Sequence, residues 1–260
     1  MNNFKNPINN LAPRIIVCMD IKQGRVVKGV NFKQLKDMGE PIELALLYEQ
    51  QGVDELVFLD IAATIEKQKT ALNLVAKIAK NLSIPFTVGG GLRTLDDVKA
   101  FLDAGADKVA LNTTAILTPS TINETAKIYG NQCIVVAVDV LKTVEALQVY
   151  SHGGHELTQK KLLPWCQEVA DRGAGEILLT CMHKDGVGDG FDCVLTQKVS
   201  ESVPVQVIAS GGASQPVHFL EVFQKNIDAC LAAGMFHSKN YTVNEVKDYL
   251  FIQGIPVRKI

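Results

Sequence analysis

Two aspartates end two strand-like runs that lie nearly half the chain apart. Asp20 closes "RIIVCMD" at residues 14–20, and Asp139 closes "CIVVAVD" at residues 133–139, 119 residues later. One carboxylate can act as a general base and the other as a general acid when their surroundings separate their pKa values. A single aspartate at a strand end more often caps a turn, and it is the paired spacing that favours catalysis here.

Two glycine runs follow the same kind of spacing. The run "PFTVGGGLR" at 85–93 and the run "VIASGGA" at 207–213 place glycines 89 and 90 at an offset of 122 from Gly211 and Gly212. Glycine after a strand can simply form a tight turn. Glycine before a helix can also let a phosphate approach the backbone N–H groups. Two equivalent runs favour two anion sites, and hence a long substrate with a phosphate at each end.

The elements that would carry these residues alternate along the chain. Short runs rich in Val, Ile, Leu and Ala are typical of buried parallel strands, and amphipathic segments between them predict helices. The expected strands are 14–20, 55–60, 84–90, 108–112, 133–139, 176–180, 203–212 and 228–234. The expected helices include 41–52, 70–82, 95–105, 161–173 and 243–251. Eight alternations predict a single (β/α)8 TIM barrel over residues 14–260, after a flexible lead-in at 1–13. A Rossmann-like sheet is the alternative, although no GxGxxG follows the first strand.

The offsets also predict an internal repeat. The segment "DELVFLD" at 54–60 echoes "GEILLTC" at 175–181, and "ADKVALN" at 106–112 echoes "IDACLAA" at 227–233, each at an offset of 121. A constant offset near half the length predicts a barrel built from two similar half-barrels. Asp20 shares the parity of Ile16 and Cys18, and Asp139 that of Ala137. Both carboxylates are therefore expected to face the barrel axis at opposite sides of its mouth.

Composition narrows the class of function. The net charge is −2 over 260 residues, which argues against a nucleic-acid or membrane-surface binder. No apolar run is long enough to span a bilayer, and we expect a cytoplasmic protein. The six scattered cysteines predict reduced core thiols, and no His/Cys/Asp cluster has the spacing of a metal site. We expect no metal and no cofactor.

These segments together resemble the cyclase subunit of imidazole glycerol phosphate synthase. The resemblance runs from about residue 13 to residue 258 and is carried by "VVKGVNF", "DELVFLDI", "PFTVGGGLR", "GADKVALNTTA", "CIVVAVD", "GAGEILLT" and "VIASGGA". It implies a lyase of histidine biosynthesis that pairs with a glutaminase subunit as a heterodimer. Ammonia from the glutaminase would react with a bis-phosphorylated phosphoribulosyl-formimino aminoimidazole carboxamide ribonucleotide. The products would be imidazole glycerol phosphate and aminoimidazole carboxamide ribotide.

The resemblance also implies roles for residues of this sequence. Asp20 and Asp139 would be the acid/base pair, and Lys28 would contact substrate from a lid-like loop at 21–40. Arg14, Glu55, Lys108 and Glu176 would gate ammonia, and Asp107 would lie at the partner interface. The residues expected to bind substrate or phosphate are Lys28, Gly90, Gly91, Asn112, Thr113, Thr180, Asp185, Gly186, Ser210, Gly211, Gly212 and Gly234.

The sequence departs from the family pattern near the substrate. His183 replaces an acidic residue and Val187 a threonine, Gly234 replaces a serine, and Ala62 stands where threonine is usual. A lost hydrogen bond to a charged group typically costs about 1.5–3 kcal/mol. These changes favour the alternative of a paralogue that supplies ammonia for another amination, such as surface-sugar modification. Two further alternatives are a scaffold that only activates its glutaminase and the sister isomerase of the same pathway.

Overall fold

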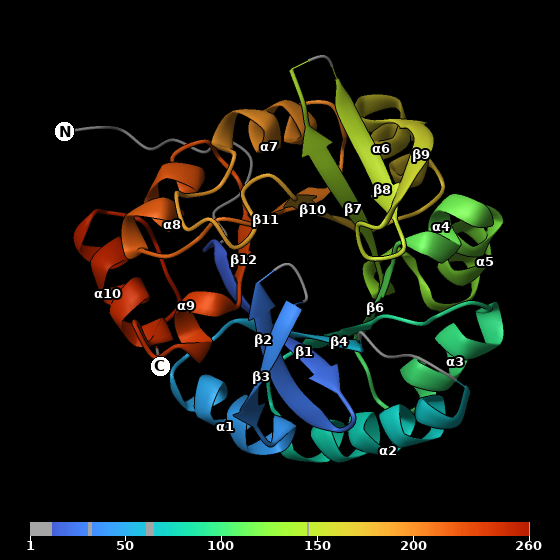
Figure 1. Cartoon of the computed structure of the whole chain (residues 1–260), viewed down its shortest axis with the longest axis horizontal. Helices are drawn as coiled ribbons and strands as arrows, with labels where there is room; N and C mark the ends of the chain where they lie inside the picture. The colour runs from blue at the N-terminus through green and yellow to red at the C-terminus, as the bar shows by residue number, and fades with distance from the viewer. Residues whose placement is uncertain (1–11, 31–32, 61–64, 145, 260) are drawn as a thin grey trace.

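Eight parallel strands close into a barrel in the part of the chain that the structure describes (Figure 1). The structure is a computed structural model that describes residues 12–30, 33–60, 65–144 and 146–259. The strands of the barrel are β1 (Arg14–Lys22), β4 (Glu55–Asp60), β5 (Phe86–Gly89), β6 (Lys108–Leu111), β7 (Ile134–Lys142), β10 (Glu176–Cys181), β11 (Gln206–Ser210) and β12 (Ala229–Ala232). Pairing runs in chain order from β1 to β12, and β12 pairs with β1 to close the ring. This topology confirms the predicted TIM barrel over the Rossmann-like sheet.

Helices surround the barrel and cover its outer face (Figure 1). They are α1 (Pro41–Gln50), α2 (Ile65–Asn81), α3 (Leu95–Asp103), α4 (Thr113–Leu117), α5 (Ser120–Tyr129), α6 (Leu162–Asp171), α7 (Cys193–Ser200), α8 (Pro216–Phe223), α9 (Gly234–His237) and α10 (Val243–Ile252), with a short 3-10 helix η1 (Asn131–Cys133). Capping residues in the sequence determine where some of these helices begin. Thr94 and Thr242 each form a capping box, with Asp97 and Glu245 respectively, at the first turns of α3 and α10.

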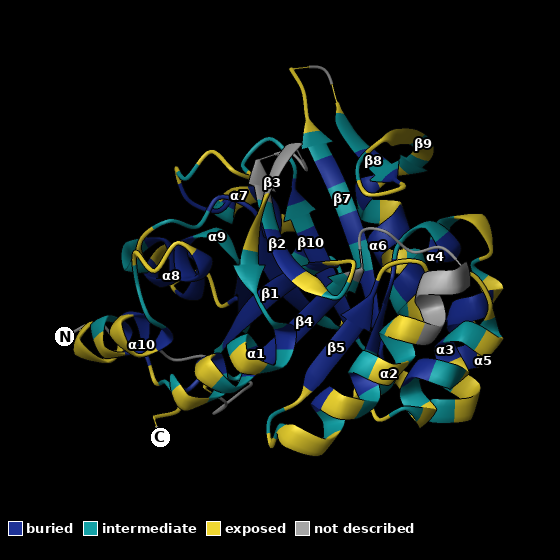
Figure 2. Ribbon diagram, turned by 60° about the horizontal axis from the view of Figure 1, so that its bottom comes forward, coloured by how far each residue is buried: buried dark blue, intermediate teal, exposed yellow. Residues whose placement is uncertain are grey.

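Alternate residues of each strand point inward and outward. Ile16 and Cys18 pack inside the barrel with side chains from the other strands, whereas Ile15 and Val17 pack outward beneath the helices. The strands are therefore buried on both faces, and exposed residues gather on the outer sides of the helices (Figure 2). This parity confirms the expectation that the positions of Asp20 and Asp139 face the axis.

The two half-barrels carry equivalent insertions. A hairpin of β2 (Arg25–Val30) and β3 (Lys33–Gly39) follows β1, and β8 (Leu147–Ser151) with β9 (Glu156–Lys161) follows β7. Asp20 pairs with Val27 across β1 and β2, and Asp139 pairs with Tyr150 across β7 and β8. Each aspartate thus lies where its barrel strand continues into an antiparallel extension.

The hairpin corrects one expectation. The resemblance predicts a long lid-like loop over residues 21–40, whereas the described part of that segment is mostly β-strand. The strands form because β2 pairs antiparallel with both β1 and β3. The expected lead-in at 1–13 lies largely outside the described residues, and Ala62 lies wholly outside them.

No helix among the described residues is long and apolar enough to cross a membrane.

Candidate active site

Two aspartates lie at the carboxyl ends of β1 and β7, and neither forms an ion pair with a cation among the described residues. Burial and repulsion from Asp185 raise the pKa of Asp20 to about 6, against a smaller opposing effect of the Cys18 thiol. Burial and repulsion from Asp185 raise the pKa of Asp139 to about 6 as well. The Cys18 Sγ lies 3.9 Å from Asp20 Oδ1, and Asn112 Nδ2 lies 3.4 Å from Asp139 Oδ2.

Asp185 is the third carboxylate of this mouth. It lies in the turn after β10, where burial raises its own pKa and the backbone N–H of Gly186 partly opposes that rise. Its backbone N–H donates to the carbonyl of Cys181 at 3.2 Å, which fixes the turn. The sequence indicated Asp185 only as a substrate contact. The structure adds that its charge acts on both aspartates of the pair.

The first glycine run opens onto the same mouth. Gly90 and Gly91 are exposed after β5, and β6 leads next to Asn112 and Thr113 at the start of α4. The Asn112 amide is already engaged, because Nδ2 donates to the Ala137 carbonyl at 3.1 Å. Thr113 Oγ1 accepts from the backbone N–H of His152 at 2.9 Å. In this half, the glycine backbone is therefore the more open surface for an anion.

The second glycine run is packed more tightly. Gly211 and Gly212 have φ values of 95° and 104°, which favour glycine. A Cβ at Gly211 would lie 2.8 Å from the Cys181 carbonyl oxygen, and one at Gly212 would collide with the Gly190 carbonyl. The tight turn after β11 therefore accounts for glycine at both positions. Binding an anion there would be a second role of the same glycines. Ser210 lies opposite Thr180 in the register of β11 and β10.

Gly234 and Lys28 meet at the start of α9. Lys28 Nζ donates to the Gly234 carbonyl at 2.9 Å. A Cβ at Gly234 would lie 3.4 Å from both Cε and Nζ of Lys28. The structure thus brings together the lysine of the hairpin and the turn after β12, two positions that the sequence assigned separately to substrate binding.

The opposite end of the barrel is closed by a basal ring of Arg14, Glu55, Lys108 and Glu176. Arg14 contacts Glu55 at 2.7 Å and Glu176 at 2.6 Å, while Lys108 contacts both carboxylates at 2.9 Å. Burial alone would raise the pKa of Glu176, but Arg14 and Lys108 outweigh it and lower that pKa. Opposite charges alternate around the ring, so each charge has two partners.

Sequence reasoning missed two polar neighbours of the basal ring. Thr87 Oγ1 donates to Glu55 Oε1 at 2.7 Å, and Arg14 donates to Gln206 Oε1 at 3.0 Å. Both residues lie near strand starts with inward parity, which is the signal that could have found them. Asp107 lies beside the ring, where its Oδ2 accepts from the backbone N–H of Phe86 at 2.9 Å.

The altered loop after β10 is held by its own contacts. His183 Nε2 lies 3.1 Å from Asp192 Oδ2, and Lys184 Nζ pairs with Asp189 at 2.8 Å. Asp192 also caps α7 through the N–H of Leu195. The histidine that replaces the family's acidic residue is thus bound to a capping carboxylate. No group of three or more metal-ligating side chains occurs within the described ranges.

A closed parallel barrel with paired acidic side chains at the carboxyl ends of its strands defines a (β/α)8-barrel enzyme. A family model described as "Histidine biosynthesis protein" matches residues 14–242. The chain belongs to this family and, within it, to the subunit HisF proteins of imidazole glycerol phosphate synthase.

Curated relatives carry that name across bacteria and an archaeon. The chain is 54% identical over 251 residues to imidazole glycerol phosphate synthase subunit HisF of Geobacillus kaustophilus, covering 95% of this chain and 100% of the relative. The Bacillus subtilis protein of the same name is 52% identical over the same shares. The Thermococcus onnurineus protein is 49% identical, over 95% of this chain and 98% of the relative. None of these names supports the alternative of a barrel that aminates something else.

Proposed function

We propose that this chain is the cyclase subunit of imidazole glycerol phosphate synthase and that Asp20 and Asp139 carry its chemistry. The observation that supports the assignment of these residues is the cluster of three carboxylates at the carboxyl end of the barrel, in which burial and the charge of Asp185 raise the pKa of both Asp20 and Asp139 to about 6. Ammonia would add to the formimino nucleotide, and ring closure and cleavage would give imidazole glycerol phosphate and the aminoimidazole carboxamide ribotide.

The raised pKa values suit acid and base work near neutral pH. Because burial and the charge of Asp185 raise the pKa of each carboxyl to about 6, either one can carry a proton or be ionised near neutral pH. One aspartate can then hold a proton for a leaving oxygen while the other accepts a proton from the attacking nitrogen. The Cys18 thiol lies beside the Asp20 carboxylate and the Asn112 amide lies beside the Asp139 carboxylate, so each has one neighbouring donor.

The bis-phosphorylated substrate would bridge the mouth. One phosphate would bind at Gly90, Gly91 and Thr113. The other would bind at Ser210 and the first turn of α9, where Lys28 brings a positive charge to the Gly234 carbonyl. Backbone N–H groups at such turns attract anions without a large net charge. This agrees with the chain's net charge of −2.

The basal ring would face a partner subunit. The relatives are named as subunits, and we propose a glutaminase that docks on this end and delivers ammonia through the barrel. Four ion pairs join the charges of the ring, and ammonia would pass when one of these pairs opens. Asp107 lies beside the ring and would contact the partner. The ring would thus act as a gate whose strength depends on its alternating charges.

Turnover by the purified chain tests the proposal. The bis-phosphorylated ribonucleotide is incubated with the chain and excess ammonium at alkaline pH, where free ammonia is abundant, and both products are identified by mass. We expect both to form in equal amounts without any partner. A folded chain that leaves the substrate unchanged would refute the proposal, and the His183–Asp192 loop would be the first segment to restore.

A further inference from the structure

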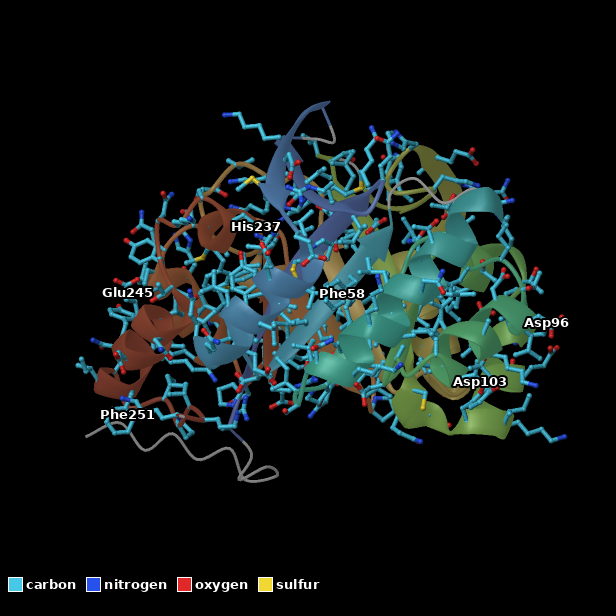
Figure 3. The ribbon with its side chains drawn as sticks, turned by 90° about the horizontal axis from the view of Figure 1, so that it is seen from below. Phe58, Asp96, Asp103, His237, Glu245 and Phe251 are labelled. Atoms are coloured by element: carbon cyan, nitrogen blue, oxygen red, sulfur yellow. The ribbon has the colours of Figure 1, made fainter. Side chains whose placement is uncertain are left out.

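His237 joins three elements inside the wall of the barrel. It ends α9, its side chain is buried, and it lies toward the end of the molecule from which the β2–β3 hairpin extends (Figure 3). Its Nε2 is 2.8 Å from the carbonyl oxygen of Cys18 in β1, and its Nδ1 is 2.7 Å from the hydroxyl of Tyr48 in α1. None of the sequence patterns pointed to this residue.

The contacts determine which nitrogen of His237 carries the proton. A carbonyl oxygen can only accept, so Nε2–H donates to Cys18 and Nδ1 accepts from the Tyr48 hydroxyl. Burial, aided by the charge of the Lys28 ammonium and opposed by the bond to the Cys18 carbonyl, lowers the pKa of His237 to about 4. Burial raises the pKa of Tyr48 to about 12. Both side chains are therefore neutral near pH 7, with one fixed hydrogen-bond direction.

The Cys18 carbonyl lies where the strand ladder stops. Pairing of β1 with β12 ends at Val17, opposite Ala232. The next carbonyl lies beyond the last paired residue, and a buried carbonyl without a donor is costly. His237 supplies the donor from the helix that follows β12. Asp20 lies two residues further along the same strand.

The other half-barrel has a comparable contact at the same place in its strand. Pairing of β6 with β7 ends at Leu111, opposite Val136. The next carbonyl, that of Ala137, accepts from Asn112 Nδ2 at 3.1 Å. Asn112 comes directly after β6, whereas His237 is the fifth residue after β12, and Asp139 lies two residues beyond Ala137. Each aspartate therefore lies two residues past a carbonyl held by a side chain from the preceding unit.

We propose that His237 is a positioning residue that fixes the end of β1 and thereby the Asp20 carboxylate, as the counterpart of Asn112 in the other half. The effect that we expect His237 to have on catalysis rests on the proposed function. It assigns Tyr48 the subordinate role of holding the imidazole in the tautomer that donates to Cys18. A role in which His237 only anchors α9 to α1 would depend on Tyr48 instead.

Two substitutions separate these roles. His237→Gln places an amide near the position of Nε2 and can still donate to the Cys18 carbonyl. His237→Asn places its amide near the position of Nδ1, so it keeps a partner for Tyr48 and loses the donor to Cys18. Each variant retains one buried hydrogen bond, so thermal unfolding should shift by similar amounts in both. A third variant, Tyr48→Phe, removes only the bond to the imidazole.

Steady-state kinetics with ammonium give the first readout. For His237→Asn we expect kcat to fall about a hundredfold, the scale of a roughly 1 Å misplacement of a catalytic group, with little change in KM. His237→Gln and Tyr48→Phe should stay within a few-fold of the unsubstituted chain. Equal losses in the Asn and Gln variants, or a larger loss in Gln, would overturn the proposal. So would an effect confined to KM.

A second readout does not need turnover. The pKa of the Asp20 carboxyl group is measured by ¹³C NMR of its carboxyl carbon in the unsubstituted chain, in His237→Gln and in His237→Asn. We expect a pKa of about 6 in the unsubstituted chain. We expect that value to persist in His237→Gln and to fall in His237→Asn, as the loosened strand end admits water. The same pKa in both variants would overturn the positioning role. If the difference appears in a chain that never turns over substrate, the positioning role stands and the proposed function fails.

Discussion

The two ends of the barrel carry similar numbers of charged side chains, but these side chains are arranged in opposite ways. At the amino ends of the strands, Arg14 and Lys108 alternate with Glu55 and Glu176, and every charge is paired. At the carboxyl ends, the acidic groups repel one another and have no cation partner among the described residues. The pKa of Glu176 is lowered, whereas the pKa values of the upper aspartates are raised.

This contrast distinguishes an end of the barrel whose charges stabilise the fold from an end whose carboxylates suit proton transfer. In a ring of alternating charges, each group is stabilised by its oppositely charged neighbours, so the ring can stay closed without a ligand. Neighbouring like charges that are partly withdrawn from solvent are unfavourable, and they persist where a substrate or a proton is expected to relieve them. We therefore propose that protons move at the upper end and that the lower end controls the passage of ammonia. The predictions below test that difference, beginning with the largest effect.

Removing either upper carboxylate should have the largest effect. Asp20→Asn and Asp139→Asn keep the shape of the side chain and remove its proton transfer. We expect turnover with ammonium to fall by about 10²–10⁴-fold or more, the range typical of a lost general acid or base. Rates are compared with Asp37→Asn, an exposed carboxylate of the hairpin that should leave turnover unchanged. Normal turnover in either buried variant would remove that residue from the mechanism.

Breaking the basal ring should have a smaller effect on catalysis and a clear one on stability. Glu55→Gln leaves two cations with one carboxylate, and removal of one partner from a buried ion network costs about 3–5 kcal/mol. The exposed pair of Lys259 and Asp248 is the control, because such pairs contribute about 0–1 kcal/mol. Urea unfolding of Glu55→Gln and Asp248→Asn measures both.

The same ring variant separates two activities. Glu55→Gln should reduce the glutamine-dependent reaction, measured with the glutaminase partner, more than the reaction with free ammonium. Lys108→Met should behave in the same direction from the positive side of the ring. Equal losses in the two assays would rule out a gate and leave the ring a purely structural feature.

Stability should depend on pH through the upper carboxylates. The pKa of Asp20 is raised from 3.8 to about 6, so the folded state binds this proton more tightly than the unfolded state. Its stabilising contribution is therefore full below about pH 4 and is lost as the pH rises through 6. Asp20→Asn should become more stable than the unsubstituted chain over that interval, by up to about 3 kcal/mol at pH 8. A constant difference from pH 4 to pH 8 would contradict the raised pKa.

Restoring a hydroxyl at the start of α9 should have the smallest effect. A serine Cβ at residue 234 would meet only the flexible end of Lys28, at 3.4 Å. Gly234→Ser should leave kcat unchanged and lower KM by up to about tenfold, the value of one hydrogen bond to a charged group. A rise in KM would show that the contact of Lys28 with the Gly234 carbonyl matters more than the hydroxyl.

The sequence predicted the features that follow from period and repeat. Strand parity placed Asp20 and Asp139 inward, and the constant offset between halves predicted equivalent ends. The hairpin after β1 was missed because its apolar alternation is short and glycines flank it. Thr87, Gln206 and His237 were missed because their partners are far away in the chain. The pKa values could not be predicted, since they depend on burial and on how near Asp185 lies.

The most direct test compares both ends of the barrel in one assay. The bis-phosphorylated ribonucleotide is incubated with excess ammonium and with the unsubstituted chain, Asp20→Asn or Glu55→Gln, and imidazole glycerol phosphate is quantified. We predict product from the unsubstituted chain, nearly as much from Glu55→Gln, and almost none from Asp20→Asn. Product from Asp20→Asn together with its loss in Glu55→Gln would contradict the assignment of chemistry to the upper end.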